Sequence, residues 1–202
     1  MYRLYDYLPS GNGYKVRLVL KYLQLPYEVI EKDILQGATR TPEYLNLNPN
    51  GRIPLLEIRG KGHLAESHAI IAYLAEETDL IPQGRFDRAL MWQWLCFEQY
   101  NLEPNVATVR FWVSILRKTE TELGEKLVEK RKLGYAALDV LEKGLQGKHF
   151  LVGDRYSLAD IALYAYTHLA QEGGFDLTKY ANIRAWCERI TKLPQWAPIT
   201  SQ

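Results

Sequence analysis

Three short segments in the first third of the chain place polar side chains where a ligand could be held. The first is Ser10-Gly11-Asn12-Gly13, between a predicted strand and a predicted helix. The first N–H groups of a helix lack partners inside the helix and the dipole is positive there, so this end favours a phosphate, a carboxylate or a thiolate. From local sequence alone a structural interpretation is favoured, in which Ser10 or Asn12 caps the helix and Gly11 and Gly13 serve the turn. Nucleotide phosphates are not favoured, because neither GxGxxG nor GxxxxGK[ST] occurs near this strand.

The other two segments suit a peptide-like ligand. Pro54 opens a short apolar strand, and a cis Ile53–Pro54 bond would turn the Ile53 N–H and C=O outward to pair with an extended peptide. Only about 5–6% of X–Pro bonds in folded proteins are cis. Glu66 and Ser67 open another predicted helix, where the serine suits a carboxylate and the glutamate an ammonium group. Capping explains either residue alone equally well.

Alternating strand and helix patterns must position these segments. The strand patterns are Tyr2–Tyr7, Tyr27–Asp33 and Leu55–Ile58, and the helical patterns are Tyr14–Leu23 and Ser67–Glu77. After Pro82 and Gly84 the periodicity is almost entirely helical. We therefore predict an α/β domain over residues 1–79, a linker over 80–86 and an all-α domain over 87–202.

Two features of the second half are predicted to be structural. An apolar stripe predicts one long helix and consists of Leu123, Leu127, Gly134, Leu138, Leu141 and Leu145. The charged run 125–132 on that helix is interpreted as a solvated face. Ser157 and Asp160 form a capping-box pattern, with Tyr156 and Ile161 placed as a hydrophobic staple, and so predict a helix start rather than a catalytic group.

Composition excludes several classes of protein. The 202 residues carry 25 Lys+Arg against 24 Asp+Glu, so the charge does not favour nucleic acid or an anionic membrane as partner. A hydrophobic fraction of 47% excludes disorder. Cys96 and Cys187 form no CxxC pair and the four histidines lack ligand spacing, so we expect neither a metal site nor a disulfide scaffold. No apolar run is long enough for a membrane span and the N-terminus lacks signal-peptide features, so we expect a cytoplasmic protein.

The order of these features along the chain resembles the cytosolic glutathione transferases, in particular serine-type bacterial-like members. The resemblance spans nearly the whole chain, from the hydroxyl before the first helix to the segment Phe150–Asp160. It implies a thioredoxin-like N-terminal domain that binds glutathione as co-substrate. It also implies an all-α C-terminal domain that supplies a second-substrate site, and a homodimer.

The resemblance assigns roles to individual residues. Ser10 matches the residue that contacts the glutathione sulfur, because S-x-x-x-Y-K-V-R looks like the serine-type pattern. Tyr7 stands about where tyrosine-type members place their tyrosine, and Asn12 is also within reach of a helix-start sulfur, so both remain alternatives. Tyr100 and Arg110, on the first long helix of the α domain, are candidates for the second-substrate pocket, although a helix of this composition is also typical of core and interface.

The glutathione contacts follow from the same resemblance. Ile53 and Pro54 match the cis-proline dipeptide that pairs with the cysteinyl backbone of glutathione, and Arg52 is a weaker match beside it. Glu66 and Ser67 match the pair that holds the γ-glutamyl end. The implied function is conjugation of glutathione to small, electrophilic, mostly apolar compounds. The alternatives are a glutathione-dependent isomerase or disulfide reductase, or a non-catalytic binding or regulatory protein.

Overall fold

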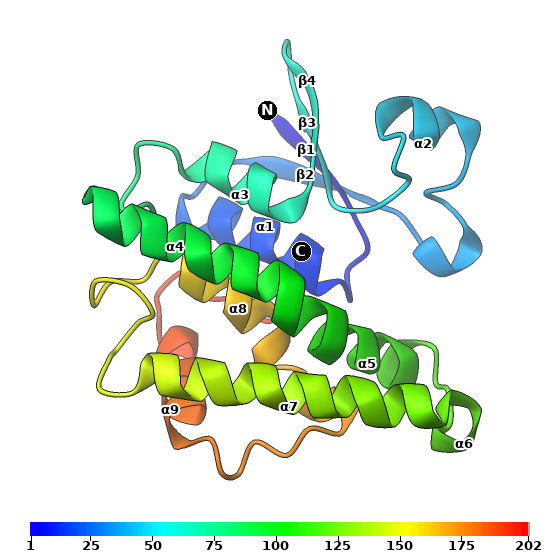
Figure 1. Cartoon of the computed structure of the whole chain (residues 1–202). Coiled ribbons are helices and arrows are strands. Elements are labelled where there is room, and N and C mark those ends of the chain that lie inside the picture. Colours follow the sequence, from blue (N-terminus) through cyan, green and yellow to red (C-terminus); the bar gives the residue numbers. More distant parts are fainter. Residues whose placement is uncertain (202) are drawn as a thin grey trace. The chain divides into compact units, whose positions relative to one another are not determined.

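The computed structural model describes residues 1–201 and divides the chain into two compact units. The first unit is Met1–Thr78 together with the segment that begins at Pro194, and the second is Asp79–Leu193 (Figure 1). The first part of the first unit ends at Thr78, and the predicted bound of the α/β domain is residue 79. The C-terminal segment differs, since the prediction places it in the helical domain. It joins the first unit because side chains of the first helix bind its backbone, as described below.

The first unit is a four-stranded sheet with thioredoxin-like connectivity. Its strands are β1 (Tyr2–Asp6), β2 (Tyr27–Glu31), β3 (Leu55–Ile58) and β4 (Gly62–Ala65), in the order β2-β1-β3-β4. β1 pairs parallel with β2 and antiparallel with β3, which pairs antiparallel with β4. The helices are α1 (Gly11–Tyr22), α2 (Pro42–Leu47) and α3 (Ser67–Ala75), and a 3₁₀ turn covers Ile34–Gln36. α1 and α3 lie on the same side of the sheet, whereas α2 stands apart from them (Figure 1).

Burial in β1 follows the two-residue period of a strand. Leu4 and Asp6 are both fully buried, whereas Tyr5 between them is only half-buried and Arg3 before them is exposed. Leu4 shares its core with apolar residues of α1, β3 and α3, among them Val16, Val19, Leu20, Leu56, Ile70 and Ile71. The same face of the strand therefore buries a carboxylate among apolar side chains, and such a group requires a charged partner.

The second unit consists of helices. A continuous helical stretch starts with α4 (Arg85–Phe97), passes through a π-helical segment (Glu98–Ala107) and α5 (Thr108–Arg110), and ends with a second π-helical segment (Phe111–Ile115). Pro104 lies inside the first π-helical segment, where its missing N–H and its ring oppose a regular α-helical turn. The remaining elements are α6 (Glu120–Leu123), α7 (Glu125–Leu145), α8 (Leu158–Thr167), a 3₁₀ turn (Ala170–Gly173) and α9 (Ala181–Thr191). Within residues 1–201, none of the helices has the length and apolarity that a membrane crossing requires.

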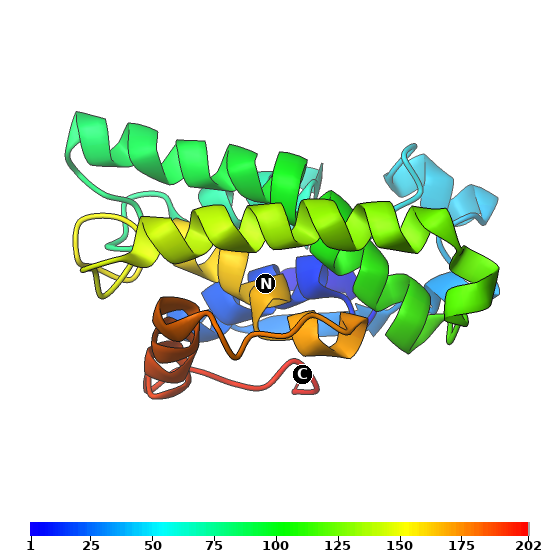
Figure 2. The ribbon, with the colours of Figure 1, turned by 60° about the horizontal axis from the view of Figure 1, so that its bottom comes forward.

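The predicted leucine stripe is confirmed with one correction. Leu127, Leu138, Leu141 and Leu145 are buried on α7, which Figure 2 presents as one unbroken helix. Leu123 is also buried but belongs to the separate short helix α6. The helix is interrupted at Gly124, whose φ is 52° and ψ is −136°. Glycine adopts this backbone conformation readily, and an α-helix cannot continue through it. The prediction that Leu123 belongs to the same helix as the other leucines is therefore wrong.

The predicted capping box at the start of α8 is confirmed. The Asp160 carboxylate accepts hydrogen bonds from the Ser157 N–H and hydroxyl, both at 3.0 Å. It also accepts from the Leu151 N–H at 3.0 Å and from Trp186 Nε1 on α9 at 2.9 Å. Burial raises the pKa of Asp160 to about 6, and the four donors act in the opposite direction. The cap therefore also joins α8 to α9 and to the loop before α8.

His168 follows α8 and is held there as a neutral ring. Its Nδ1 lies 2.6 Å from the Tyr164 carbonyl, and the two rings stack with centroids 4.3 Å apart. Burial lowers the pKa of His168 to about 4, and nearby Arg110 lowers it further, whereas the Tyr164 carbonyl and Glu172 raise it.

We expect this histidine to make the protein less stable in mild acid. The unfolded chain takes up a proton near pH 6.5 and the folded chain only near pH 4, so stability present above pH 6.5 is lost as the pH falls through this window. Between pH 7 and pH 5 the loss amounts to about 2 kcal/mol. Because buried carboxylates with a raised pKa, such as Asp160, change stability in the opposite direction, the test is the difference between two proteins. In urea unfolding at both pH values, the change in stability from pH 7 to pH 5 should be about 2 kcal/mol less favourable in the wild type than in His168→Gln. Equal pH dependence of the two proteins would contradict the prediction.

Candidate active site

The strand register brings the three predicted ligand segments to one edge of the sheet. Tyr5 near the end of β1 pairs with Leu55 at the start of β3, and Leu55 also pairs with Ala65 at the end of β4. Because β3 runs antiparallel to both neighbours, the loop after β1, the turn before β3 and the residues after β4 all leave the sheet at the same edge. These are the segments that carry Ser10, Ile53-Pro54 and Glu66-Ser67.

Ser10 is the N-cap residue of α1. Its backbone is extended, with φ −74° and ψ 124°, and its hydroxyl oxygen accepts a hydrogen bond from the Gly13 N–H at 3.3 Å. A hydroxyl that accepts in this way still has its own proton to donate. Capping and ligand binding are therefore compatible at this residue, and the half-buried Ser10 hydroxyl lies at the positive end of a twelve-residue helix.

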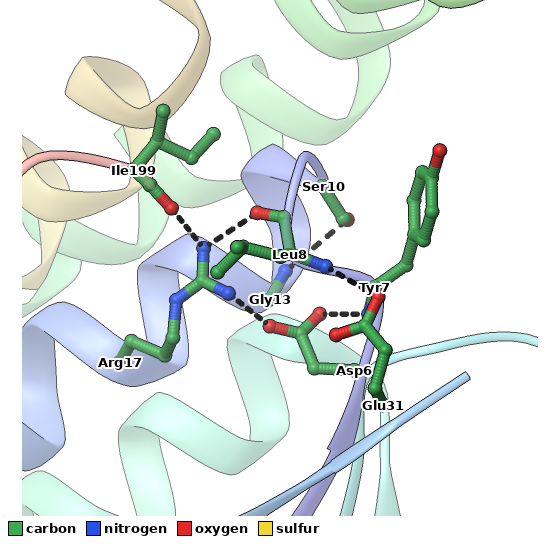
Figure 3. A network of polar contacts seen from close by, with 8 residues as sticks. All are labelled: Asp6, Tyr7, Leu8, Ser10, Gly13, Arg17, Glu31 and Ile199. Carbon is green, nitrogen blue, oxygen red and sulfur yellow. Dashed lines mark hydrogen bonds and ion pairs between the residues drawn. The ribbon is translucent and has the colours of Figure 1, made fainter. Parts of the chain in front are cut away.

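The two alternatives to Ser10 occupy different positions. The Tyr7 N–H donates to Asp6 Oδ1 at 2.7 Å, and the Tyr7 ring points away from the ion pair between Asp6 and Arg17 (Figure 3). Asn12 lies in the first turn of α1, and its Oδ1 accepts from Lys15 Nζ at 2.9 Å. The choice of Ser10 as the sulfur contact stays a prediction.

A hydrogen bond joins two of the predicted segments directly. The Ser67 hydroxyl lies 3.4 Å from Asn12 Oδ1, so the N-terminal turns of α3 and α1 meet. Lys15, which is 0% exposed, contacts Asn12 and also lies 3.4 Å from His68 Nε2 on α3. A buried ammonium group beside two helix N-termini makes this corner electropositive. The sequence analysis gave Lys15 no role, although Lys15 and Arg17 both stand among apolar residues of α1.

The cis Ile53–Pro54 bond implied by the resemblance is confirmed. The Tyr44 hydroxyl donates to the Arg52 carbonyl at 2.7 Å and Asn48 Nδ2 donates to the same oxygen at 2.8 Å. Pro54 is buried and the Arg52 side chain is exposed. Tyr44 and Asn48 therefore hold the turn that presents the Ile53 backbone, and the sequence did not indicate them, because they act through a backbone oxygen.

Glu66 and Ser67 differ sharply in burial. Ser67 is 5% exposed and is the first residue of α3, whereas Glu66 is exposed and has a φ of 69°. A positive φ is uncommon for a residue other than glycine, and such conformations concentrate at ligand sites. The Glu66 side chain forms no cap bond with α3. The capping alternative is thus not supported for Glu66, and its role toward an ammonium group stays a prediction.

A buried ion pair lies beneath the Ser10 loop. Arg17 Nη1 donates to Asp6 Oδ2 at 2.6 Å, and both side chains are almost completely buried (Figure 3). Burial raises the pKa of Asp6, whereas the Arg17 guanidinium and the Tyr7 N–H lower it. A Cβ atom at position 13 would overlap the Asp6 carboxylate. Gly13 is therefore required by this close approach. It lies inside α1, and not in the turn that the structural interpretation of this segment assigned to it.

The two second-substrate candidates lie in different environments of the helical unit. Arg110 is 6% exposed and its Nε donates to Glu172 Oε2 at 2.7 Å. Tyr100 is 83% exposed in the first π-helical segment. The ion pair gives Arg110 a structural role within this unit, and the second-substrate role of both residues stays a prediction.

Comparison with known proteins covers both units. The family model "Glutathione S-transferase, N-terminal domain" matches residues 1–76, and "Glutathione S-transferase, C-terminal domain" matches residues 87–194. A glutathione S-transferase of Pseudomonas fluorescens has a solved structure that is 45% identical, with a TM-score of 0.96 and 99% of each chain covered.

Relatives with other activities are also similar over nearly the full length. The disulfide-bond oxidoreductase YfcG of Escherichia coli is 32% identical over 93% of this chain and 89% of its own. A maleylacetoacetate isomerase of Dictyostelium discoideum is 30% identical over 98% of this chain and 93% of its own. With both domain models matched in order, the chain belongs to the glutathione S-transferase family and is a glutathione transferase, with glutathione as its co-substrate.

Proposed function

We propose that the chain conjugates the glutathione thiolate to small, electrophilic, mostly apolar compounds, a reaction of the kind used in detoxification. The observation that carries the proposal is the convergence of Ser10, Ile53-Pro54 and Ser67 at one edge of the sheet. Ser67 and Glu66 would hold the γ-glutamyl carboxylate and ammonium groups, with Lys15 adding positive charge nearby. The Ile53 backbone would pair with the cysteinyl residue, with Arg52 beside it.

Ser10 would act as a hydrogen-bond donor to the sulfur and not as a base. A thiol with a pKa near 8.5 is only a few per cent ionised at pH 7, and lowering that pKa by about two units requires about 2.7 kcal/mol. One hydrogen bond to a charged group contributes about 1.5–3 kcal/mol, and a helix N-terminus about 0.3–1 kcal/mol more. Ser10 and α1 together are therefore sufficient in magnitude, and the nucleophile is supplied by the co-substrate.

A second candidate is glutathione-dependent disulfide reduction, which the similarity to the Escherichia coli oxidoreductase favours. Position 10 is a serine, so this protein residue cannot form a mixed disulfide. The bound thiolate itself would attack a small disulfide, forming a glutathione mixed disulfide and releasing the other half as a thiolate. Isomerisation is favoured only by the similarity to the Dictyostelium enzyme. A non-catalytic binding protein is disfavoured because all three ligand segments are retained.

Assembly and location belong to the same proposal. We propose a homodimer, the assembly that the family resemblance implies. Sedimentation should then give a mass twice the 23.4 kDa of the chain. We propose a cytoplasmic location because the chain carries only two cysteines, unpaired with each other.

The decisive experiment is to titrate the protein with glutathione and record thiolate absorbance in the ultraviolet across pH. We expect saturable binding at or below millimolar glutathione and a bound-thiol pKa about two units below 8.5. S-methyl glutathione is the control, since it should bind without the thiolate band. Rates with an aryl halide and with bis(2-hydroxyethyl) disulfide then separate conjugation from disulfide reduction. A protein that does not bind glutathione at millimolar concentration would contradict both candidates.

A further inference from the structure

The segment that begins at Pro194 is bound along one face of α1. The Tyr14 hydroxyl donates to the Ala197 carbonyl at 2.6 Å, Arg17 Nη2 to the Ile199 carbonyl at 3.0 Å, and Lys21 Nζ to the Ser201 hydroxyl at 2.9 Å. The three donors stand at helical spacings of three and four, so they share one face of α1. The three acceptors are alternate residues of the segment. This regular pairing fixes the register of the segment on the helix.

Arg17 joins this segment to the loop that carries Ser10. The same Nη2 that donates to Ile199 also donates to the Leu8 carbonyl at 2.9 Å, while Nη1 binds the Asp6 carboxylate (Figure 3). Arg17 is 1% exposed, and among the described residues its Nε has no acceptor. The guanidinium therefore depends on these three oxygens, and the C-terminal segment supplies one of them.

Charged side chains hold the short loop between β1 and α1 on several sides. Asp6 accepts from the Tyr7 N–H, and Glu31 Oε1 accepts from the Leu8 N–H at 3.1 Å. The Ser10 N–H donates to the Tyr7 carbonyl at 2.7 Å. Pro9 has no backbone N–H and so needs no acceptor. The position of the Ser10 hydroxyl is thus set by a loop whose underside rests on the Asp6–Arg17 pair.

We propose that the C-terminal segment, acting through Arg17, positions the Ser10 loop and thereby tunes the acidity of the bound glutathione thiol. This inference rests on the proposed function and extends it to residues nearly two hundred positions away in sequence. Arg17 is a positioning residue and not a catalytic one. If the segment loosens, Arg17 loses an acceptor and water gains access to the ion pair, so the Leu8 carbonyl and Ser10 become less restrained. A small misplacement of a group that stabilises charge is sufficient to slow a reaction.

The test separates the segment from the buried arginine, because removing one partner of a buried ion pair can prevent folding. The double variant Tyr14→Phe/Lys21→Met removes two hydrogen bonds to the segment and leaves Asp6, Leu8 and Arg17 intact. Arg17→Lys keeps the charge but not the forked geometry. The control is Arg3→Met, which removes exposed ion pairs to Glu28 and Glu57 on the same sheet.

Two measurements are made on each protein. In the double variant without ligand, we expect the amide protons of residues 7–10 to exchange faster than in the wild type and in Arg3→Met. With glutathione, we expect the bound-thiol pKa to rise by about half a unit to one unit and kcat to fall about three- to tenfold, with KM for glutathione within about twofold. Arg17→Lys should show the same changes at the upper end of these ranges.

Each outcome bears on the proposal. Unchanged loop exchange and thiol pKa in the double variant, with only a lower melting temperature, would overturn it and leave the segment as a structural brace. If the wild type itself did not bind glutathione, the proposed function would fail, while exchange in the ligand-free protein would still decide whether the segment controls the loop. A rise in KM alone would also contradict the inference, since it would place the effect on binding.

Discussion

Replacing Ser10 by alanine is expected to lower kcat/KM for conjugation about 10- to 100-fold. The variant lacks the hydrogen bond to the sulfur, which is worth about 1.5–3 kcal/mol for a charged acceptor, and each 1.36 kcal/mol corresponds to a tenfold change. The bound-thiol pKa should rise in parallel by about one to two units. The measurements are steady-state kinetics and the ultraviolet pH titration of bound glutathione.

Controls distinguish this role from helix capping. Ser10→Ala also loses the bond to the Gly13 N–H, at a cost of about 1 kcal/mol in stability. Ser10→Asp retains a side-chain oxygen for the cap but has no donor at neutral pH, so it should be stable and inactive. Ser10→Thr retains both functions and should keep most of the activity. Tyr7→Phe and Asn12→Ala should leave the thiol pKa within about half a unit.

Other activity patterns among these variants would contradict the assignment of Ser10 as the sulfur contact. Full activity in Ser10→Ala, together with loss of activity in Tyr7→Phe, would transfer the role to Tyr7. Loss of activity in Asn12→Ala with an elevated thiol pKa would transfer it to Asn12. A rise in KM without a change in thiol pKa would instead assign Asn12 to the γ-glutamyl end, where it contacts Ser67.

Replacing Asp160 by asparagine is expected to destabilise the protein by about 3–5 kcal/mol. The carboxylate accepts four hydrogen bonds from residues 151, 157 and 186, and an amide offers only one acceptor oxygen to them. The amide nitrogen would face donors at complete burial, and loss of a buried charged partner is among the most costly substitutions. Urea unfolding at pH 7.5 measures the effect with the carboxylate ionised, since burial raises its pKa to about 6.

Matched substitutions test whether the network is responsible. Asp154→Asn changes an exposed carboxylate in the loop before α8, whose Oδ1 accepts from the His149 N–H at 3.2 Å. This variant should alter stability by less than about 0.5 kcal/mol. Ser157→Ala leaves Asp160 with its other donors and should cost about 1 kcal/mol. If Asp160→Asn were as stable as Asp154→Asn, the network would not contribute to stability as its geometry indicates.

Local features of the chain could be predicted from sequence because their causes lie within a few residues. The cap at Ser157 and Asp160 is an exchange of hydrogen bonds across three positions, and the burial of the α7 stripe follows from the helical period. Glycine signals were harder to interpret. Gly124 ends α6 and separates Leu123 from α7, whereas Gly13 lies inside a helix. The two glycines differ in backbone conformation and in the side chains around them, and the sequence next to each glycine shows neither difference.

By itself, the sequence determined the two-part architecture, the helix starts and the order of the three ligand segments. Only the tertiary structure decided that these segments meet, because strand register depends on pairing between Tyr5, Leu55 and Ala65, which are distant in sequence. The same holds for Lys15 between two helix starts and for Arg17 between Asp6 and Ile199. A buried charge is stable only where its partners converge, and chain topology rather than local pattern sets that convergence.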